Sequence, residues 1–320
     1  MSKKDLAYLK KRFARIRYYI GETFELKKKV SSVDTLLSEV SLTPDLQARV
    51  NYYCQLNEPF IVSSRAVRND KFVRTKSFAY FADLKRITRH FPDYYRFDYL
   101  FGDVVDIPSV PTFVKSRPIC NGNENSVLLK LNAIRHYQFV EDTKPFGDKL
   151  PLAVWRGMVY HQHRREFVDR YYESKFANIG HNDDSLVHEP AYKGFMSIQE
   201  QLNHRYIVSV EGKDVATNLK WAMASNSLVM MRKPKFETWF MEGQLIAGVH
   251  YVELKEDFSD LEEKVQFYNE HPQQAEIIVR NAQAYVKQFL DEKQELIVSL
   301  LVAQKYFNLS QLSDTSYCQK

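Results

Sequence analysis

A polar loop follows one of the most strongly β-forming runs of the chain. The run 206–210 is apolar and β-branched, which is typical of a buried parallel strand, and it leads into Glu211–Lys220. Gly212 permits a tight turn, Asp214 is predicted to cap a helix, and the run 226–231 predicts the next strand. Free N–H groups and the helix dipole at such a loop suit a phosphate. From this stretch alone an ordinary crossover without ligand is the favoured interpretation, because it has neither Gly-x-Gly-x-x-Gly nor a Walker lysine.

Cationic side chains follow a second predicted strand. The apolar run 152–155 ends at Arg156-Gly157, and Arg164 and Arg165 come shortly afterwards. Guanidinium groups at a strand end can bind a diphosphate bidentately. The alternative is a set of solvent-exposed charges at the start of a helix.

Two carboxylates precede a proline-punctuated loop in the first half of the chain. Asp103 and Asp106 lie just before Ile107–Pro111, where a fixed carboxylate could serve as a general base. Turn or capping aspartates are the alternative. The pair His161 and His163 lacks further ligands at zinc spacing, so we predict no metal site. Residues near the later strands could bind sugar hydroxyls or form a polar rim: Glu237, His250 and Glu253.

The bulk properties indicate a two-domain protein with anionic partners. The chain has 320 residues, 44% of them hydrophobic, three cysteines and a net charge of +5. We predict an N-terminal domain over 1–145 and a C-terminal domain over 146–320, divided in the polar segment 141–149 and both built from alternating strands and helices. The last helix is a candidate to pack back on the first domain. The start of the chain has no apolar signal-peptide core, which predicts a cytoplasmic protein.

The first 30 residues form a basic, amphipathic pattern. Apolar residues recur at helical spacing between many lysines and arginines over 3–30. One interpretation is a helix that lies on anionic lipid. The other is a first helix whose apolar stripe packs on its own domain while its charges are solvated.

Four motifs in this order resemble glycosyltransferase family 90, which holds bacterial lipopolysaccharide-core glycosyltransferases, fungal capsule xylosyltransferases and animal protein O-glucosyltransferases. The resemblance covers roughly residues 99–289. The motifs that carry it are Asp106–Pro111, Trp155-Arg156-Gly157 with Arg164, Glu211–Lys220, and His250-Tyr251. The stretch 115–118, with residues 125–136, resembles the bacterial branch in particular.

The resemblance implies a GT-B architecture, with two Rossmann-like doubly wound domains facing across a cleft. It also implies inverting transfer from a UDP-sugar without a metal or other cofactor, with Asp106 as general base. The implied donor-binding residues are Arg156, Gly157, Met158, Arg164, Gly212, Lys213, Asp214, Val215, Ala216, Thr217, Asn218 and Lys220, and the acceptor-side residues are Lys115, Arg117 and Asn125. Asn218 departs from the eukaryotic arginine, so the diphosphate charge must be met by Arg164, Arg156, Lys220 or the helix N-terminus.

The function that these features imply is transfer of a hexose, such as glucose or galactose, to a lipopolysaccharide core or related surface glycan. The basic first segment and Lys115 with Arg117 would suit a phosphorylated, lipid-anchored acceptor at the inner face of the inner membrane. A different class of protein stays open from composition alone. A non-catalytic basic protein would bind nucleic acid or anionic membrane and would have no affinity for a nucleotide sugar.

Overall fold

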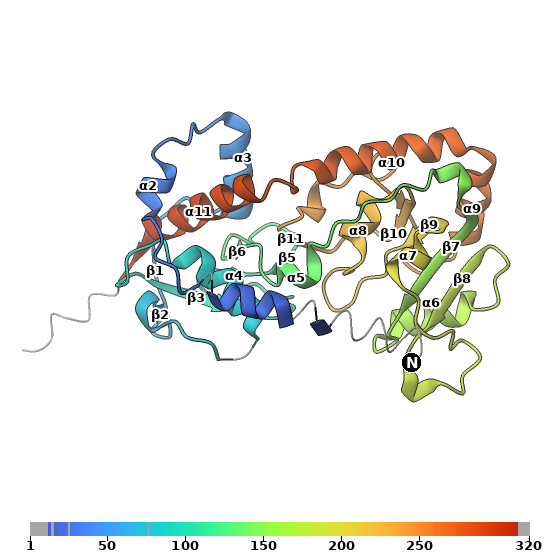
Figure 1. The fold of residues 1–320 in the computed structure, drawn as a ribbon, viewed down its shortest axis with the longest axis horizontal. Helices are drawn as coiled ribbons and strands as arrows, with labels where there is room; N and C mark the ends of the chain where they lie inside the picture. Colours follow the sequence, from blue (N-terminus) through green and yellow to red (C-terminus); the bar gives the residue numbers. More distant parts are fainter. Residues whose placement is uncertain (1–11, 14–15, 25, 76, 313–320) are drawn as a thin grey trace, which may run out of the picture. The chain divides into compact units, whose positions relative to one another are not determined.

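The chain folds as a mixed α/β protein, which confirms the predicted class. The computed structural model describes residues 12–13, 16–24, 26–75, 77–312. The described chain divides into two compact units (Figure 1). Unit 1 comprises Arg12 with 135–234 and 242–288, and unit 2 comprises 13–134, 235–241 and 289–312, each without the undescribed positions. The predicted domain boundary after residue 145 stays a prediction.

Unit 1 is built on a five-stranded parallel sheet with strand order β12-β10-β9-β7-β8. Its strands are apolar on both faces, as expected where helices cover a parallel sheet. The neighbours β7 and β9 are not consecutive, so the strand order reverses between them, and ligands bind at such a switch point in open α/β sheets. The strands are β7 (Leu150–Gly157), β8 (Ala177–His181), β9 (His204–Val208), β10 (Leu228–Met231) and β12 (Val252–Glu253).

Helices pack against this sheet through an apolar core. Helix α6 contacts β8, α9 contacts β7, and both α8 and α10 contact β10. The core joins Trp155 and Tyr206 of the sheet to Phe167 of α6 and Leu261 of α9. The helices are α6 (Gln162–Tyr171), α7 (Ile198–Gln201), α8 (Leu219–Ala224), α9 (Leu261–Glu270) and α10 (Pro272–Lys287), with the short η2 (Phe146–Asp148), η3 (Asp184–Leu186) and η4 (Glu242–Gln244).

The polar segment 141–149 packs within unit 1. Lys149 is buried and places its Nζ 2.7 Å from Asp142 Oδ2, and the backbone N–H of Asn226 donates to the same carboxylate oxygen at 2.9 Å. A buried charge needs such a partner because desolvation disfavours it otherwise. The ion pair thus closes the segment on itself, and hydrogen bonds from Asn226 to Asp142 and from Lys149 to the carbonyl of Leu202 hold it to the body of unit 1.

Unit 2 has smaller sheets. Its four-stranded sheet has the order β2-β3-β4-β6, antiparallel between β2 and β3 and parallel elsewhere; β1 pairs with β13 in parallel and β5 with β11 in antiparallel fashion. The strands are β1 (Phe60–Ile61), β2 (Val67–Arg68), β3 (Arg96–Leu100), β4 (Thr112–Val114), β5 (Ser116–Pro118), β6 (Ser126–Leu128), β11 (Phe236–Thr238) and β13 (Ser310–Gln311).

The long helix α11 organises the core of unit 2. It packs against α2, α3 and α4, and its Tyr306 and Phe307 join Phe97 and Phe113 of the sheet in an aromatic cluster. Among the described residues, no helix has the length and apolar character to cross a bilayer. The labelled helices are α2 (Val33–Leu37), α3 (Pro44–Tyr53), α4 (Phe78–Thr88) and α11 (Glu292–Leu309), with η1 (Asn69–Lys71); α5 (Ala133–His136) lies where the chain leaves unit 2.

Candidate active site

One arginine bridges the two strand ends at the switch point of unit 1. Arg164 extends from α6 and donates from Nε to the carbonyl of Glu211 at 2.8 Å and from Nη2 to that of Val210 at 2.9 Å. Its Nη1 donates to the carbonyl of Met158 at 3.3 Å. Because Met158 follows β7 and Val210 follows β9, the guanidinium joins the carboxyl ends of the two strands between which the order reverses.

The charge of Arg164 has no carboxylate partner among the described residues. Burial, with the nearby charge of Arg135, lowers its pKa to about 10. The carbonyl oxygens carry only partial negative charge, so a full positive charge remains at the strand ends. Such a charge in a partly desolvated place attracts an anion.

Two histidines of the same segment support the loop after β9. His163 places Nε2 2.9 Å from the carbonyl oxygen of Glu211, and its ring stacks on that of His161. A Cβ on Gly212 would lie 3.5 Å from Arg164 Nη2 and 3.8 Å from His161 Nε2, so the loop backbone rests on these side chains. The sequence interpretation considered the histidines only as metal ligands and missed this contact.

A second arginine missed from the sequence holds the side chain of Glu211. Arg232 follows β10 and forms an ion pair with Glu211, and its Nη1 donates to the carbonyl of Glu256 at 2.9 Å. Burial lowers the pKa of Arg232. The signal that could have found it is its position directly after a predicted strand, which is the rule that singled out Arg156.

The predicted helix cap at Asp214 is wrong. Helix α8 begins only at Leu219, and Asn218 occupies its N-cap position without a capping side-chain bond. Asp214 is buried and accepts a hydrogen bond from the N–H of Val215 at 2.7 Å. Asn218 instead donates from Nδ2 to the carbonyl of Val208 at 3.0 Å, which fixes the loop to the end of β9. Residues 211–218 form an irregular loop of bends and turns, in which Lys213 is exposed while Val215 and Ala216 are buried and Thr217 is half-buried.

Two of the other three predicted donor cations, Arg156 and Lys220, have partners elsewhere. Arg156 donates to the carbonyl and side chain of Asn178 on the neighbouring strand β8, at 3.2 and 2.7 Å, and burial lowers its pKa to about 10. Lys220 is buried with its Nζ 2.5 Å from Glu242 Oε1. Arg164 is therefore the predicted donor cation that reaches the loop after β9 from another element, while Lys213 lies in that loop and is exposed.

Gly157 is explained by local packing. A Cβ at this position would lie 2.6 Å from Cζ2 of Trp155, closer than atoms in contact can approach. The indole belongs to the core of the unit, so it has little room to move. The glycine thus lets the chain turn over the indole toward Met158.

The two candidate carboxylates of unit 2 differ in their partners. Asp103 accepts a hydrogen bond from Lys115 Nζ at 2.6 Å, whereas Asp106 is exposed and has no hydrogen bond or ion pair among the described residues. Asn125 donates from Nδ2 to the carbonyl of Pro108 at 3.0 Å and so braces the loop that carries Asp106. Asp106 is therefore the carboxylate that is open to a substrate.

The predicted acceptor-side cations are buried. Lys115 is paired with Asp103, and Arg117 is fully buried with its Nε 2.7 Å from Glu237 Oε1 and its Nη2 2.7 Å from the carbonyl of Tyr52. Both side chains thus have internal partners, and contact with an acceptor stays a prediction. The polar-rim candidates also have partners: His250 Nδ1 accepts from the N–H of Ile246 at 3.0 Å, and Glu253 accepts from Tyr251 at 2.9 Å.

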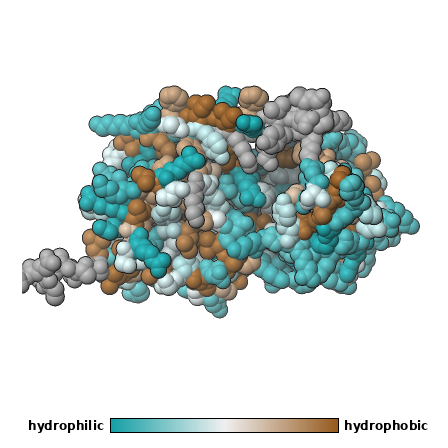
Figure 2. Space-filling model, turned by 90° about the horizontal axis from the view of Figure 1, so that it is seen from below, coloured by the Kyte–Doolittle hydropathy of each residue, from teal (hydrophilic) through white to brown (hydrophobic). Residues whose placement is uncertain are grey.

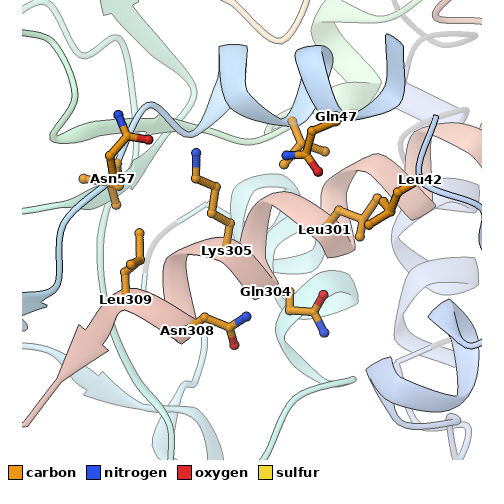
Figure 3. Close-up of a pocket in the computed structure, with 10 residues that line it drawn as sticks. Leu42, Gln47, Asn57, Leu301, Gln304, Lys305, Asn308 and Leu309 are labelled. Carbon is orange, nitrogen blue, oxygen red and sulfur yellow. The ribbon is translucent and has the colours of Figure 1, made fainter. Parts of the chain in front are cut away.

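A groove of about 320 Å³ on unit 2 lies apart from these residues. It lies between α3 and the C-terminal half of α11 (Figure 3) and contains none of the predicted site residues. Its lining is mixed, with Gln47, Asn57 and Gln304 beside leucines. Among the described residues, no group of three or more histidines, cysteines or carboxylates could hold a metal ion, and independence from metal stays a prediction.

Comparison with known proteins identifies the family. Residues 129–315 match the model of glycosyl transferase family 90. The O-glucosyltransferase LpsA of Dichelobacter nodosus is 47% identical over 264 residues, which are 82% of this chain and 83% of that protein. The chain belongs to glycosyl transferase family 90 and is a glycosyltransferase, an enzyme that takes a sugar donor and a glycan acceptor.

Two animal relatives match a smaller part. Protein O-glucosyltransferase 2 of Danio rerio is 26% identical over 44% of this chain and 29% of its own length, and protein O-glucosyltransferase 3 of Rattus norvegicus is 30% identical over 35% and 22%. The match to the family model includes Arg164 and the loop after β9 but begins after Asp106. Asp106 as base therefore rests on its own motif and geometry.

Proposed function

We propose that this glycosyltransferase transfers a hexose, with inversion, from a UDP-sugar to a hydroxyl of a lipopolysaccharide core or related surface glycan. The name of the Dichelobacter nodosus relative supports glucose as the first hexose to test. The observation that carries the donor assignment is Arg164 at the switch point of unit 1, a half-buried guanidinium that donates to three carbonyls and has no carboxylate partner among the described residues.

The donor diphosphate is assigned to Arg164 and the loop 211–218. A leaving UDP accumulates negative charge as the glycosidic bond breaks, and a fixed cation there can supply a few kcal/mol of transition-state stabilisation. Asn218 cannot supply this charge, and Lys220 and Arg156 have partners of their own. We assign the positive charge to Arg164, together with the exposed Lys213 of the loop itself, and the proposal requires no metal ion.

Asp106 is assigned as the general base. Inversion requires one carboxylate that removes the proton of the acceptor hydroxyl as its oxygen attacks the anomeric carbon. Asp106 is exposed and unpaired among the described residues, while Asp103 is engaged by Lys115. In the GT-B architecture that we propose, the base and the donor loop belong to facing domains.

The acceptor that we propose carries a lipid anchor and phosphate groups, which places the reaction at the inner face of an anionic membrane. The net charge of +5 supports such a partner. The protein is then peripheral, and it meets its acceptor in the plane of the bilayer.

A transfer assay with several donors tests the proposal. Purified protein is given UDP-glucose, UDP-galactose, UDP-xylose or N-acetylated analogues with a core oligosaccharide, and NMR identifies the anomer formed. We expect transfer of one hexose with inversion, undiminished by EDTA. UDP at 100 times its Kd should raise the free energy of unfolding by about 2.7 kcal/mol. Retention of configuration, or activity restored only by a divalent cation, would contradict the proposal.

A further inference from the structure

The helical residues 16–24 are attached to unit 2 through their polar side. Tyr18 donates from its hydroxyl to Asp83 Oδ1 at 3.1 Å, and Glu22 is buried in an ion pair with Arg86. Both partners lie on α4, beside which this helix runs at the front of Figure 1. Further along, Arg89 donates to the carbonyl of Lys28, so the segment after the helix is held to α4 as well.

The apolar side of the same helix faces solvent. Ile16, Ile20 and Phe24 are 42%, 54% and 67% exposed, and Phe13 is 68% exposed. At 3.6 residues per turn, Ile16, Ile20 and Phe24 fall within about 80° of one another, and Tyr18 with Glu22 lies roughly opposite. The helix is thus reversed relative to an ordinary surface helix, which buries its apolar stripe and exposes its polar one. A row of brown residues runs along the upper edge of Figure 2, which corresponds to the front of Figure 1.

Exposed cations flank this apolar stripe. Arg17, Lys27, Lys28 and Lys29 are exposed, and the only carboxylate among the described residues of 12–30 is Glu22, which is buried against Arg86. The surface is therefore apolar and cationic with no exposed counter-charge in its described part. Its charges would repel a second copy of the same surface, whereas they complement a surface that is both apolar and anionic.

We propose that the surface formed by Phe13, Ile16, Ile20 and Phe24, with Arg17 and Lys27–Lys29, docks this enzyme on an anionic lipid bilayer. The apolar side chains enter the boundary between headgroups and acyl chains, and the cations contact lipid phosphates. The proposal deepens the proposed function, since it names the surface that brings the enzyme to a lipid-anchored acceptor. The hydrogen bond of Tyr18 and the ion pair of Glu22 keep the helix oriented with this surface outward.

Vesicle sedimentation with the full-length protein tests the proposal. Vesicles of phosphatidylcholine are compared with vesicles that contain phosphatidylglycerol. We expect binding to the anionic vesicles that weakens with salt. The double variant Ile20→Ser, Phe24→Ser should bind at least 10-fold more weakly. Replacement of Lys27, Lys28 and Lys29 by Gln should weaken binding on the order of 100-fold, from about 1 kcal/mol per cation.

A matched control separates insertion from a general loss of apolar surface. Ile61 is 57% exposed, close to Ile20, but lies on β1 of the same unit. Ile61→Ser should leave vesicle binding unchanged. Because all substituted side chains are exposed, circular dichroism and thermal unfolding should match the wild-type protein.

Three outcomes would overturn the proposal. Equal vesicle binding by the wild-type protein and the Ile20→Ser, Phe24→Ser variant would show that this surface does not insert. Failure of the wild-type protein to bind anionic vesicles would exclude bilayer docking. A dimer that the double variant abolishes would assign the surface to a second copy. UDP-sugar hydrolysis in vesicle-free buffer reports on the proposed function separately, because none of these substitutions touches the donor loop or Asp106.

Discussion

Two arginines with internal hydrogen bonds, Arg117 in unit 2 and Arg164 in unit 1, differ in whether a carboxylate neutralises their charge. Arg117 in unit 2 pairs with Glu237 and donates to the carbonyl of Tyr52, so its charge is neutralised inside the protein. Arg164 in unit 1 donates to the carbonyls of Met158, Val210 and Glu211 and has no carboxylate partner among the described residues. The first arginine holds parts of a fold together, and the second is the residue to which we assign the donor diphosphate.

The difference lies in what each environment stabilises. Burial raises the free energy of a charge, and a carboxylate at hydrogen-bonding distance offsets that cost permanently. Carbonyl dipoles orient a guanidinium but offset the cost only in part, so an arriving diphosphate lowers the free energy further. The pair Asp103 and Asp106 repeats this contrast among carboxylates, since Lys115 neutralises the first and leaves the second open.

The largest expected effect is on the rate of transfer, and it should distinguish Asp106 from Asp103. Asp106→Asn should lower the rate of transfer by roughly 10²- to 10⁴-fold, the usual contribution of a general base, with UDP affinity and thermal stability unchanged. Steady-state transfer kinetics, UDP titration and thermal unfolding measure the three quantities.

Asp103→Asn provides the matched control. It leaves the buried Lys115 without its carboxylate, so it should lower the free energy of unfolding and affect the rate of transfer less than Asp106→Asn does. If both variants lost transfer equally while remaining folded, the distinction between a paired and an open carboxylate would be wrong.

The next largest effects should distinguish the two arginines, since one substitution should lower stability and the other UDP affinity. Arg117→Met leaves Glu237 buried without its cation and should cost about 3–5 kcal/mol of stability. Arg164→Met should weaken UDP binding roughly 10- to 100-fold, because a hydrogen bond to a charged group contributes about 1.5–3 kcal/mol. Calorimetric titration with UDP and denaturant unfolding distinguish these outcomes.

Arg164→Lys sharpens this test. A lysine keeps the charge but cannot span the three carbonyls with a planar guanidinium, so it should restore part of the UDP affinity at most. Full affinity in Arg164→Met would show that the diphosphate is held elsewhere in the protein.

Sequence periodicity was sufficient for the regular elements. The predicted strands 206–210 and 226–231 overlap β9 and β10, and the apolar run 152–155 lies within β7. Long periodic segments are predictable because their burial pattern repeats along the chain itself. The predicted cap at Asp214 is wrong because Asp214 lies five residues before Leu219, the first residue of α8, and its carboxylate accepts from the N–H of Val215 instead.

The sequence identified a site residue where a local motif marks it, but it did not identify contacts between residues that are distant in the chain. The motif with Arg164 identified the residue that meets the loop after β9. The basic residues Lys115 and Arg117 suggested an exposed patch. Arg117 is neutralised by Glu237, which lies 120 positions later in the chain, so the sequence alone does not reveal this pairing. His163 and Arg232 were missed for the same reason, since their partners in the loop are set by the tertiary fold.

The smallest expected effect is on the pH dependence of stability. It comes from Asp83, a buried carboxyl group whose burial favours its neutral form. Burial raises the pKa of Asp83 to about 7, with Ala133 N–H and the Tyr18 hydroxyl as its donors and the charges of Glu22 and Arg86 nearby. In the unfolded chain its pKa is about 3.9. Between these values the folded protein holds a proton that the unfolded protein has released.

Stability should therefore be highest below about pH 4 as far as Asp83 is concerned, and this contribution should be lost as the pH rises to about 7. The slope is at most about 1.4 kcal/mol per pH unit, because unfolding releases one proton. Asp83→Asn should flatten the slope, and the difference between the two proteins at each pH removes the contributions of other groups. Chemical denaturation from pH 4.5 to 8 measures it. Parallel curves for the two proteins would mean that Asp83 is ionised in the fold, and that its donors stabilise the carboxylate as a cation would.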